Sequence, residues 1–297
     1  MFNTPLKLKQ QVQLDSSPCS LAVSPENNLL CACYNFVADT NKRHGSIITL
    51  SIMNDSKLIN ETENHTFDNF GVLDISDRNV FCCSDGCIRS IDTNGQCETL
   101  INYGDTCCLL CQESDVIAAG CQHGHLHTPM RVGKNAHSDC IWCVRKLNDQ
   151  NLLATCSDDK QIKIWDCRCD FRKAETVITN AHQSGVCSIL QLPCFNQYTL
   201  LSCSFDGWIK NWDIKMPHVC KNKIKLDGEL WKIKWLDNIL VVVSMYNGVF
   251  VIDNELTKSE LMCPNLNNEL TYDCMLLPDK KTFALCKFYG KSIEIWN

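Results

Sequence analysis

Short apolar runs separated by polar turns recur along the whole chain. Each run is followed by a small polar turn and then by a stretch in which apolar and polar residues alternate. Alternation with period two is typical of half-buried β-strands, so the pattern predicts an all-β protein. Seven runs are expected to form inner strands: CSLAV (19–23), FGVLDI (70–75), TCCLLC (106–111), CIWCV (140–144), GVCSIL (185–190), LWKIKW (230–235) and YDCMLL (272–277).

The turns and the strands that follow them are copies of one pattern. The segment SDDKQIKIWDC (157–167) aligns without a gap on SFDGWIKNWDI (204–214), and CSDGCIRSID (83–92) follows the same plan. Equivalent turn positions recur at intervals of 36 to 47 residues, which is the period of WD repeats. We therefore predict a seven-bladed WD-repeat β-propeller that forms a single domain over residues 1–297. The equivalent turn residues are His44, Asp85, His123, Asp159, Asp206, Asn247 and Gly290.

The two ends of the chain are expected to meet in one blade. The last copy of the repeat stops at Trp296-Asn297, where its third strand ends, so this blade lacks an outer strand. Residues 5–15 alternate with period two and precede the first inner strand. The N-terminal segment is therefore predicted to complete the last blade, which would protect its open edge.

Composition changes this picture little. The 297 residues carry a net charge of -6, which disfavours nucleic acid as a partner, and no apolar run reaches the length of a membrane span. The start of the chain lacks an export signal, so the 23 cysteines are interpreted as reduced thiols, most of them buried. We expect a cytoplasmic monomer that binds neither nucleic acid nor membrane and needs no cofactor.

Two histidines have the spacing of a structural network. Ala-His occurs at residues 136–137 and again at 181–182, ahead of the two best turns. In WD repeats this His, the turn Asp, a strand Ser or Thr and the strand Trp are joined by buried hydrogen bonds. Such a group imitates a hydrolase triad while serving only the fold. The resemblance gives two networks: His137 with Asp159 and Trp165, and His182 with Asp206 and Trp212.

Metal binding is not predicted. The CxxC pairs Cys108/Cys111 and Cys140/Cys143 lie within apolar strands, where alternation sends residues three apart to opposite faces. His123, His125 and His127 share a face on a regular strand, but the turn at His123 interrupts it. A solvated turn followed by a third strand is the favoured interpretation of this segment.

The second half of the chain resembles a particular family. From residue 137 onward the order of HQSGVCSI, SFDGWIKNWD and GELWKIKW resembles the WD-repeat diphthine methyl esterases of diphthamide biosynthesis. That resemblance implies hydrolysis of a methyl ester on the modified histidine of translation elongation factor 2, with release of methanol. Asn247 and Ile252 stand where strong copies have Asp and Trp, a difference that the family also tolerates, whereas Gly290 replaces an expected acidic turn residue.

Ester hydrolysis on such a substrate needs a nucleophile or an activated water, and a pocket for a quaternary ammonium, which aromatic faces bind well. One inner-strand position carries Trp142, Cys187, Trp231 and Asp273 in successive blades, with Tyr272 adjacent. We predict that Trp142, Trp231 and Tyr272 bind the substrate, Asp273 balances its charge, and Cys187 or a water attacks with help from His182. Core packing, a non-enzymatic scaffold, and binding of a basic or methylated peptide without reaction remain open alternatives.

Overall fold

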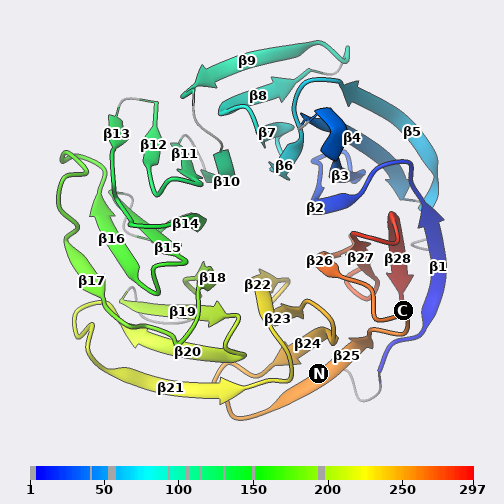
Figure 1. The fold of residues 1–297 in the computed structure, drawn as a ribbon. Helices are drawn as coiled ribbons and strands as arrows, with labels where there is room; N and C mark the ends of the chain where they lie inside the picture. Colours follow the sequence, from blue (N-terminus) through cyan, green and yellow to red (C-terminus); the bar gives the residue numbers. More distant parts are fainter. Residues whose placement is uncertain are drawn as a thin grey trace. The chain divides into compact units, whose positions relative to one another are not determined.

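Seven four-stranded antiparallel sheets make up the protein, which is the strand organisation of a seven-bladed β-propeller. The computed structural model describes residues 5–40, 42–52, 58–92, 94–104, 107–113, 116–129, 131–148, 151–192 and 198–297. In this part of the chain no helix has the length and hydropathy needed to cross a membrane, and the only helical turn is the 3-10 turn η1 (Ala38–Thr40). All seven predicted inner strands are present (Figure 1).

The residues group into two compact units, each described by itself. Unit 1 comprises residues 1–107, 245–249 and 261–297, and it holds three complete sheets. The prediction of a single domain over residues 1–297 stays a prediction. The sheets of unit 1 are β2 (Pro18–Val23), β3 (Leu29–Val37), β4 (Lys42–Ile52) and β5 (Leu58–Phe67); β6 (Val72–Ile75), β7 (Val80–Cys83), β8 (Cys87–Ile91) and β9 (Cys97–Asn102); and β26 (Thr271–Leu276), β27 (Phe283–Lys287), β28 (Ser292–Trp296) and β1 (Leu8–Gln13).

Unit 2 comprises residues 108–244 and 250–260, so the sheet β22–β25 contributes to both units. In each sheet of unit 2, strands that are neighbours in the sheet are also neighbours in the sequence. The remaining strands are β10 (Cys107–Glu113), β11 (Val116–Cys121), β12 (Leu126–Thr128) and β13 (Arg131–Gly133); β14 (Ile141–Lys146), β15 (Leu152–Ser157), β16 (Ile162–Asp166) and β17 (Thr176–Ile178); β18 (Val186–Leu190), β19 (Thr199–Ser204), β20 (Trp208–Asp213) and β21 (Cys220–Lys225); and β22 (Leu230–Leu236), β23 (Ile239–Ser244), β24 (Gly248–Ile252) and β25 (Ser259–Pro264).

The N-terminal strand completes the last sheet, as predicted. β1, blue in Figure 1, pairs antiparallel with β28, drawn in red, from Leu8 opposite Trp296 to Gln13 opposite Ser292. The Leu14 amide adds a hydrogen bond of 2.8 Å to the Lys291 carbonyl just beyond the ladder. Without β1, the backbone groups on the outer side of β28 would be an open sheet edge.

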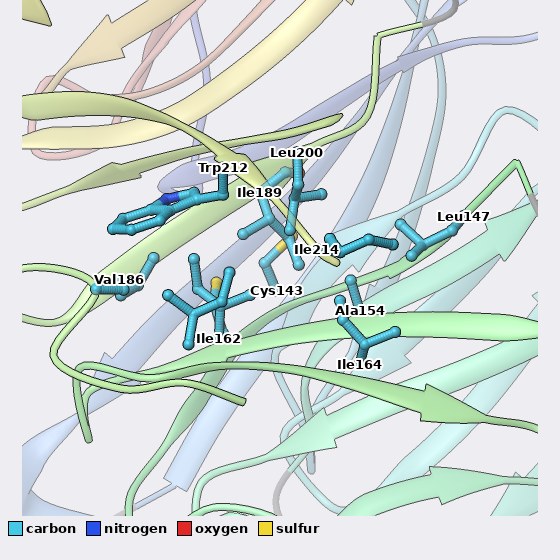
Figure 2. Packing of buried hydrophobic residues seen from close by; sticks show 13 residues of the cluster. Cys143, Leu147, Ala154, Ile162, Ile164, Val186, Ile189, Leu200, Trp212 and Ile214 are labelled. Carbon is cyan, nitrogen blue, oxygen red and sulfur yellow. The ribbon is translucent and has the colours of Figure 1, made fainter. Parts of the chain in front are cut away.

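The core of unit 2 is built from the apolar positions of successive sheets. Figure 2 shows Cys143 and Ile162 of one sheet packed with Val186, Ile189 and Trp212 of the next. All five are at most 5 % exposed, and the cysteine fills a place that another small apolar residue could fill. The strand alternation read from the sequence therefore corresponds to layers of side chains between neighbouring sheets.

Six of the inner strands share a β-bulge that adds one residue and re-aims its side chain. The register shifts between Ile141 and Cys143, for example, which leaves Trp142 as the extra residue of β14. In β26 the shift lies between Thr271 and Asp273, so the residue equivalent to Trp142 is Tyr272, and the predicted equivalence of Asp273 is wrong. The bulged residues are Cys19, Leu73, Trp142, Cys187, Trp231 and Tyr272.

The first hairpin is longer than its repeat predicts. His44 was expected in the turn, but it lies within β4 and pairs with Asn35 of β3. The ladder continues outward as far as Val37 opposite Lys42, and the turn falls at η1. The prediction that His44 marks the turn is therefore wrong, because the strands continue past the position where the other copies of the repeat turn.

Candidate functional site

The buried network expected around His137 is present in unit 2. The His137 Nδ1 atom lies 2.8 Å from Asp159 Oδ2, and Nε2 lies 2.7 Å from the Thr155 hydroxyl. The Trp165 indole donates to the same hydroxyl at 2.8 Å. Since Thr155 accepts from the indole, its own proton is available to Nε2, which leaves Nδ1 as the donor to Asp159 and the imidazole neutral.

His182 forms the same network one sheet later. Its Nδ1 atom lies 3.1 Å from both Asp206 oxygens, its Nε2 atom lies 2.7 Å from Ser202 Oγ, and the Trp212 indole donates to that hydroxyl at 2.9 Å. Burial lowers the pKa of the His182 imidazole and of His137 below their ordinary value. Burial raises the pKa of the Asp206 carboxyl, but the hydrogen bond from His182 and two backbone amides outweigh it and hold that pKa below its usual range.

These two sheets also match the model of a known family. Residues 129–166 and 174–213 match the model of the WD domain, G-beta repeat. This region therefore contains WD repeats, and the seven four-stranded sheets have the fold of a β-propeller. Strands β14 to β20, with the two histidine networks, make up most of the matched region.

Known proteins similar to this propeller share parts of it. A WD repeat-containing protein 53 homolog of Dictyostelium discoideum is 28% identical over 172 residues, which cover 54% of this chain and 44% of that protein. Human DDB1- and CUL4-associated factor 10 is 40% identical over 78 residues, 26% of this chain and 13% of that protein. The chain thus spans less than half the length of these relatives. The WD40 propeller domain of Doa1 superimposes with a TM-score of 0.76 at 15% identity, covering 99% of this chain and 97% of that one.

Two tryptophans of the predicted site meet within unit 2. The rings of Trp142, from β14, and Trp231, from β22, lie 5.1 Å apart at an angle of 65°. Strand β18 provides the small Cys187 at the equivalent bulge, so the two indoles reach each other across that strand. Phe205 packs against Trp231 at 5.7 Å. The rings touch edge to face and leave no gap for a cation between them, but Trp142 is only half-buried, so part of the residue is accessible.

A carboxylate that the sequence analysis did not select lies beside Trp142. Asp158 follows β15 in the turn, and its amide bonds to the Cys140 carbonyl at 3.1 Å, which fixes the turn against the start of β14. Its Oδ1 atom lies over the Cα atom of Gly185, where an added Cβ would overlap it. Burial raises the pKa of the Asp158 carboxyl, the Trp142 indole opposes the rise, and the nearby carboxylate of Asp139 adds to it. The only sequence signal was the first aspartate of the SDD turn, which has no part in the His137 network.

The predicted nucleophile and base are held by the fold. Cys187 is 4% exposed, and burial raises the pKa of its thiol well above the ordinary value, whereas a nucleophile needs the thiolate. The thiol donates to the Gly185 carbonyl at 3.6 Å. Both ring nitrogens of His182 are engaged by Asp206 and Ser202, so neither is left for Cys187. These surroundings argue against a Cys187–His182 pair as nucleophile and base.

Asp273 and Tyr272 lie in unit 1, where they join two sheets. Asp273 is fully buried and accepts hydrogen bonds from the backbone amides of Leu21 at 2.9 Å and Cys274 at 2.8 Å. It therefore fastens the inner strand of the last sheet to that of the first. Tyr272 stacks on Phe288 with ring centroids 4.9 Å apart. The geometry gives Asp273 a structural role, since its carboxylate is enclosed by backbone donors.

Within the described residues, the histidines and the Cys140/Cys143 pair considered for metal do not form a ligand set. In the part of the chain that the structure describes, no group of three His, Cys, Asp or Glu side chains has metal-binding geometry. His123 lies in a turn and His127 is buried on β12, with the His125 ring more than 6 Å from both. Cys140 and Cys143 are buried on β14, and the side chains of Cys108 and Cys111 lie outside the described residues.

Proposed function

We propose that the protein is a non-enzymatic binding platform that holds a cationic side chain of a partner protein against Trp142 and Asp158. The observation that carries the proposal is the half-buried Trp142 beside the half-buried carboxylate of Asp158. An indole face and a carboxylate together favour an ammonium or guanidinium group, and a partly desolvated cation–π contact stabilises such a complex by about 2 kcal/mol. Trp231 and Phe205 back the Trp142 ring and keep it in place.

Two further facts support a platform. The groups expected to carry out chemistry, Cys187, His182 and Asp273, are each engaged in packing or in hydrogen bonds that hold the fold. One relative, DDB1- and CUL4-associated factor 10, has a name that records association with other proteins. A binding role uses the Trp142 surface without needing an activated group.

The test is an NMR titration. The protein, labelled with the heavy isotope of nitrogen, is titrated with a short Gly/Ser peptide that contains one arginine. We expect the indole resonances of Trp142 and Trp231 to shift with the arginine peptide, and not with the same peptide carrying citrulline, which is uncharged. Lysine and trimethyllysine versions then rank the cations. Asp158→Asn should weaken binding about tenfold, equivalent to about 1.4 kcal/mol.

Asp170→Asn is the matched control, because it removes the same charge from an exposed turn of the same sheet. Gly185→Ala should behave like Asp158→Asn, since the added Cβ displaces the carboxylate. Equal binding of the citrulline peptide, or equal loss in Asp158→Asn and Asp170→Asn, would contradict the proposal, because net charge alone would then account for the binding.

Diphthine methyl-ester hydrolysis on translation elongation factor 2 is the second candidate. It is favoured by the resemblance of residues 137–297 and by the pairing of Trp142 with Trp231. The experiment is to incubate the purified protein with methylated elongation factor 2 and to follow loss of one methyl group by mass spectrometry. Turnover would establish the esterase, and binding that Asp158→Asn weakens without any mass loss would leave the platform.

A further inference from the structure

Exposed apolar side chains gather along one end of the sheets in unit 1. Among the described residues nine large hydrophobic side chains are exposed, and five of the six that belong to unit 1 lie near turns at the same end of three sheets. The turns β3–β4, β23–β24 and β27–β28 and the connection β25–β26 fall at that end because neighbouring strands run antiparallel. We name this set the apolar edge: Phe36 (54% exposed), Val37 (36%), Tyr246 (42%), Leu266 (60%) and Tyr289 (68%).

The turns that carry the apolar edge are tied together. The Asn265 side-chain amide donates to the carbonyls of Tyr246 at 2.9 Å and Glu269 at 2.7 Å, which joins two of the turns. The buried Lys287 ammonium donates to Asn265 Oδ1 at 3.0 Å from the base of the third turn. The side chains of the edge are therefore presented on a braced backbone, which reduces the entropy lost when a partner binds.

An aromatic stack connects the last sheet to the first hairpin. The Phe288 ring lies 5.4 Å from Tyr289, 5.1 Å from Tyr34 and 4.9 Å from Tyr272. Tyr34 belongs to β3, two residues before the exposed Phe36. The edge thus continues from Tyr289 through Phe288 to the first hairpin, instead of consisting of scattered single residues, which are normal on any surface.

The first hairpin adds positive charge to this edge. Its ladder extends to Val37 opposite Lys42, which places Lys42 and Arg43 beside Phe36 at the tip. The Arg43 guanidinium lies over the Phe36 ring at 5.8 Å. Within the described residues neither cation has a carboxylate partner, although Asp39 lies in the same turn. A docked segment could therefore satisfy both cations while covering the apolar side chains.

We infer that the apolar edge is a docking surface for a partner segment that carries a large apolar side chain next to a carboxylate. The apolar group covers Phe36 and Tyr289, and the carboxylate pairs with Arg43 and Lys42. This surface is separate in its residues from the Trp142 site, and the inference does not depend on the proposed cation binding. Charge complementarity selects the partner, because Lys42 and Arg43 at the tip of the first hairpin favour an anion.

The experiment selects a phage-displayed library of random dodecapeptides on the full-length protein and measures the affinity of the winners by fluorescence anisotropy. Peptides that pair an aromatic or leucine residue with Asp or Glu are expected. Their affinity should fall about tenfold in Tyr289→Ser and in Arg43→Gln. Two controls outside the edge, Leu100→Ser and Lys173→Gln, should leave it unchanged, as should Asp158→Asn.

Other outcomes overturn the inference. Selected peptides rich in Lys or Arg that Asp158→Asn releases would support the proposed function and remove this second surface. Equal losses in Tyr289→Ser and Leu100→Ser would mean that the edge has no special role. If no peptide is selected, and sedimentation shows a dimer that Tyr289→Ser dissociates, the edge binds a second copy of the chain and the acidic partner is refuted.

Discussion

The hydroxyl groups of Thr155 and Ser202 each lie between an imidazole and an indole. Each accepts from a tryptophan and is within 2.7 Å of a histidine nitrogen. One oxygen therefore satisfies two buried groups that belong to different strands or turns. Removing it exposes no new surface to water but leaves both partners unpaired, and an unsatisfied buried polar group costs about 1–3 kcal/mol.

Ser202→Ala should lower the free energy of unfolding by about 2–4 kcal/mol, because His182 and the Trp212 indole each lose a partner. Urea denaturation followed by tryptophan fluorescence measures this difference. Ser138→Ala, in an exposed turn, is the control and should change stability by less than about 0.5 kcal/mol. An equally small effect for Ser202→Ala would mean that the network contributes little to stability.

The same networks predict how stability depends on pH. Burial lowers the pKa of His137 and His182, so the unfolded chain binds protons more readily than the folded one as the pH falls below about 6.5. The lowered pKa values of Asp159 and Asp206 remove more stability below about pH 4. Stability should therefore be highest above pH 7 and fall in two stages on acidification. Urea midpoints measured from pH 8 to pH 3 test this, and a rise in stability between pH 7 and pH 5 would contradict it.

Residue roles were predictable where they repeat at fixed spacing. His137 and His182 each precede their turn aspartate by a similar number of residues, so the resemblance carried over to both. Asp158 could not be selected in this way, because its position beside Trp142 depends on Gly185, which another sheet provides. Contacts between neighbouring sheets have no fixed spacing in the sequence.

At the scale of elements, alternation located every inner strand but not the bulges. A bulge inserts one residue into a strand without interrupting its apolar pattern, so counting along the sequence placed Asp273 where the structure has Tyr272. The long first hairpin was missed for a related reason. His44-Gly45 looks like a turn, but tertiary pairing with Asn35 extends both strands past it.

Deleting residues 1–15 removes β1 and should strongly destabilise the last sheet. Five residues of β1 pair with β28, and at about 1 kcal/mol for each hydrogen bond the loss is about 4–6 kcal/mol. That is a large share of the stability of a typical domain, about 5–15 kcal/mol. Thermal denaturation should show a much lower melting temperature, and sedimentation should show association through the exposed edge of β28.

A synthetic peptide of residues 5–15 should restore the melting temperature of the truncated protein, whereas a peptide of the same composition in scrambled order should not. A truncated protein with unchanged melting temperature would mean that β1 is dispensable.

At the scale of the whole molecule, the reaction of cysteine thiols with a labelling reagent shows which cysteines are accessible to solvent. Most described cysteines are buried, whereas Cys97 and Cys169 are exposed. A brief pulse of maleimide on the native protein, mapped by mass spectrometry, should label these two and leave Cys187 unlabelled until denaturant is added. Rapid native labelling of Cys187 would contradict its burial and would revive it as a nucleophile.

The fold was predictable because the same pattern of strand, turn and strand occurs seven times in the sequence. A weak copy such as the one at His123 can be recognised by its spacing from strong copies such as those at Asp159 and Asp206. The candidate site has no such redundancy. It depends on Trp142, Asp158 and Trp231, and the bulge position of the two tryptophans holds Cys187 or Tyr272 in other sheets.

Because β1 pairs with β28, it stays unpaired during synthesis until β28 has been made. The hydrogen bond from Gln11 to Ser292 joins residues 281 positions apart. At about 5–20 residues per second, β1 emerges from the ribosome roughly 15–60 s before its partner strand exists. Throughout that interval its backbone donors and acceptors are available to other strands or to a chaperone, and any chain that stops short of β28 keeps the same unpaired segment for its lifetime.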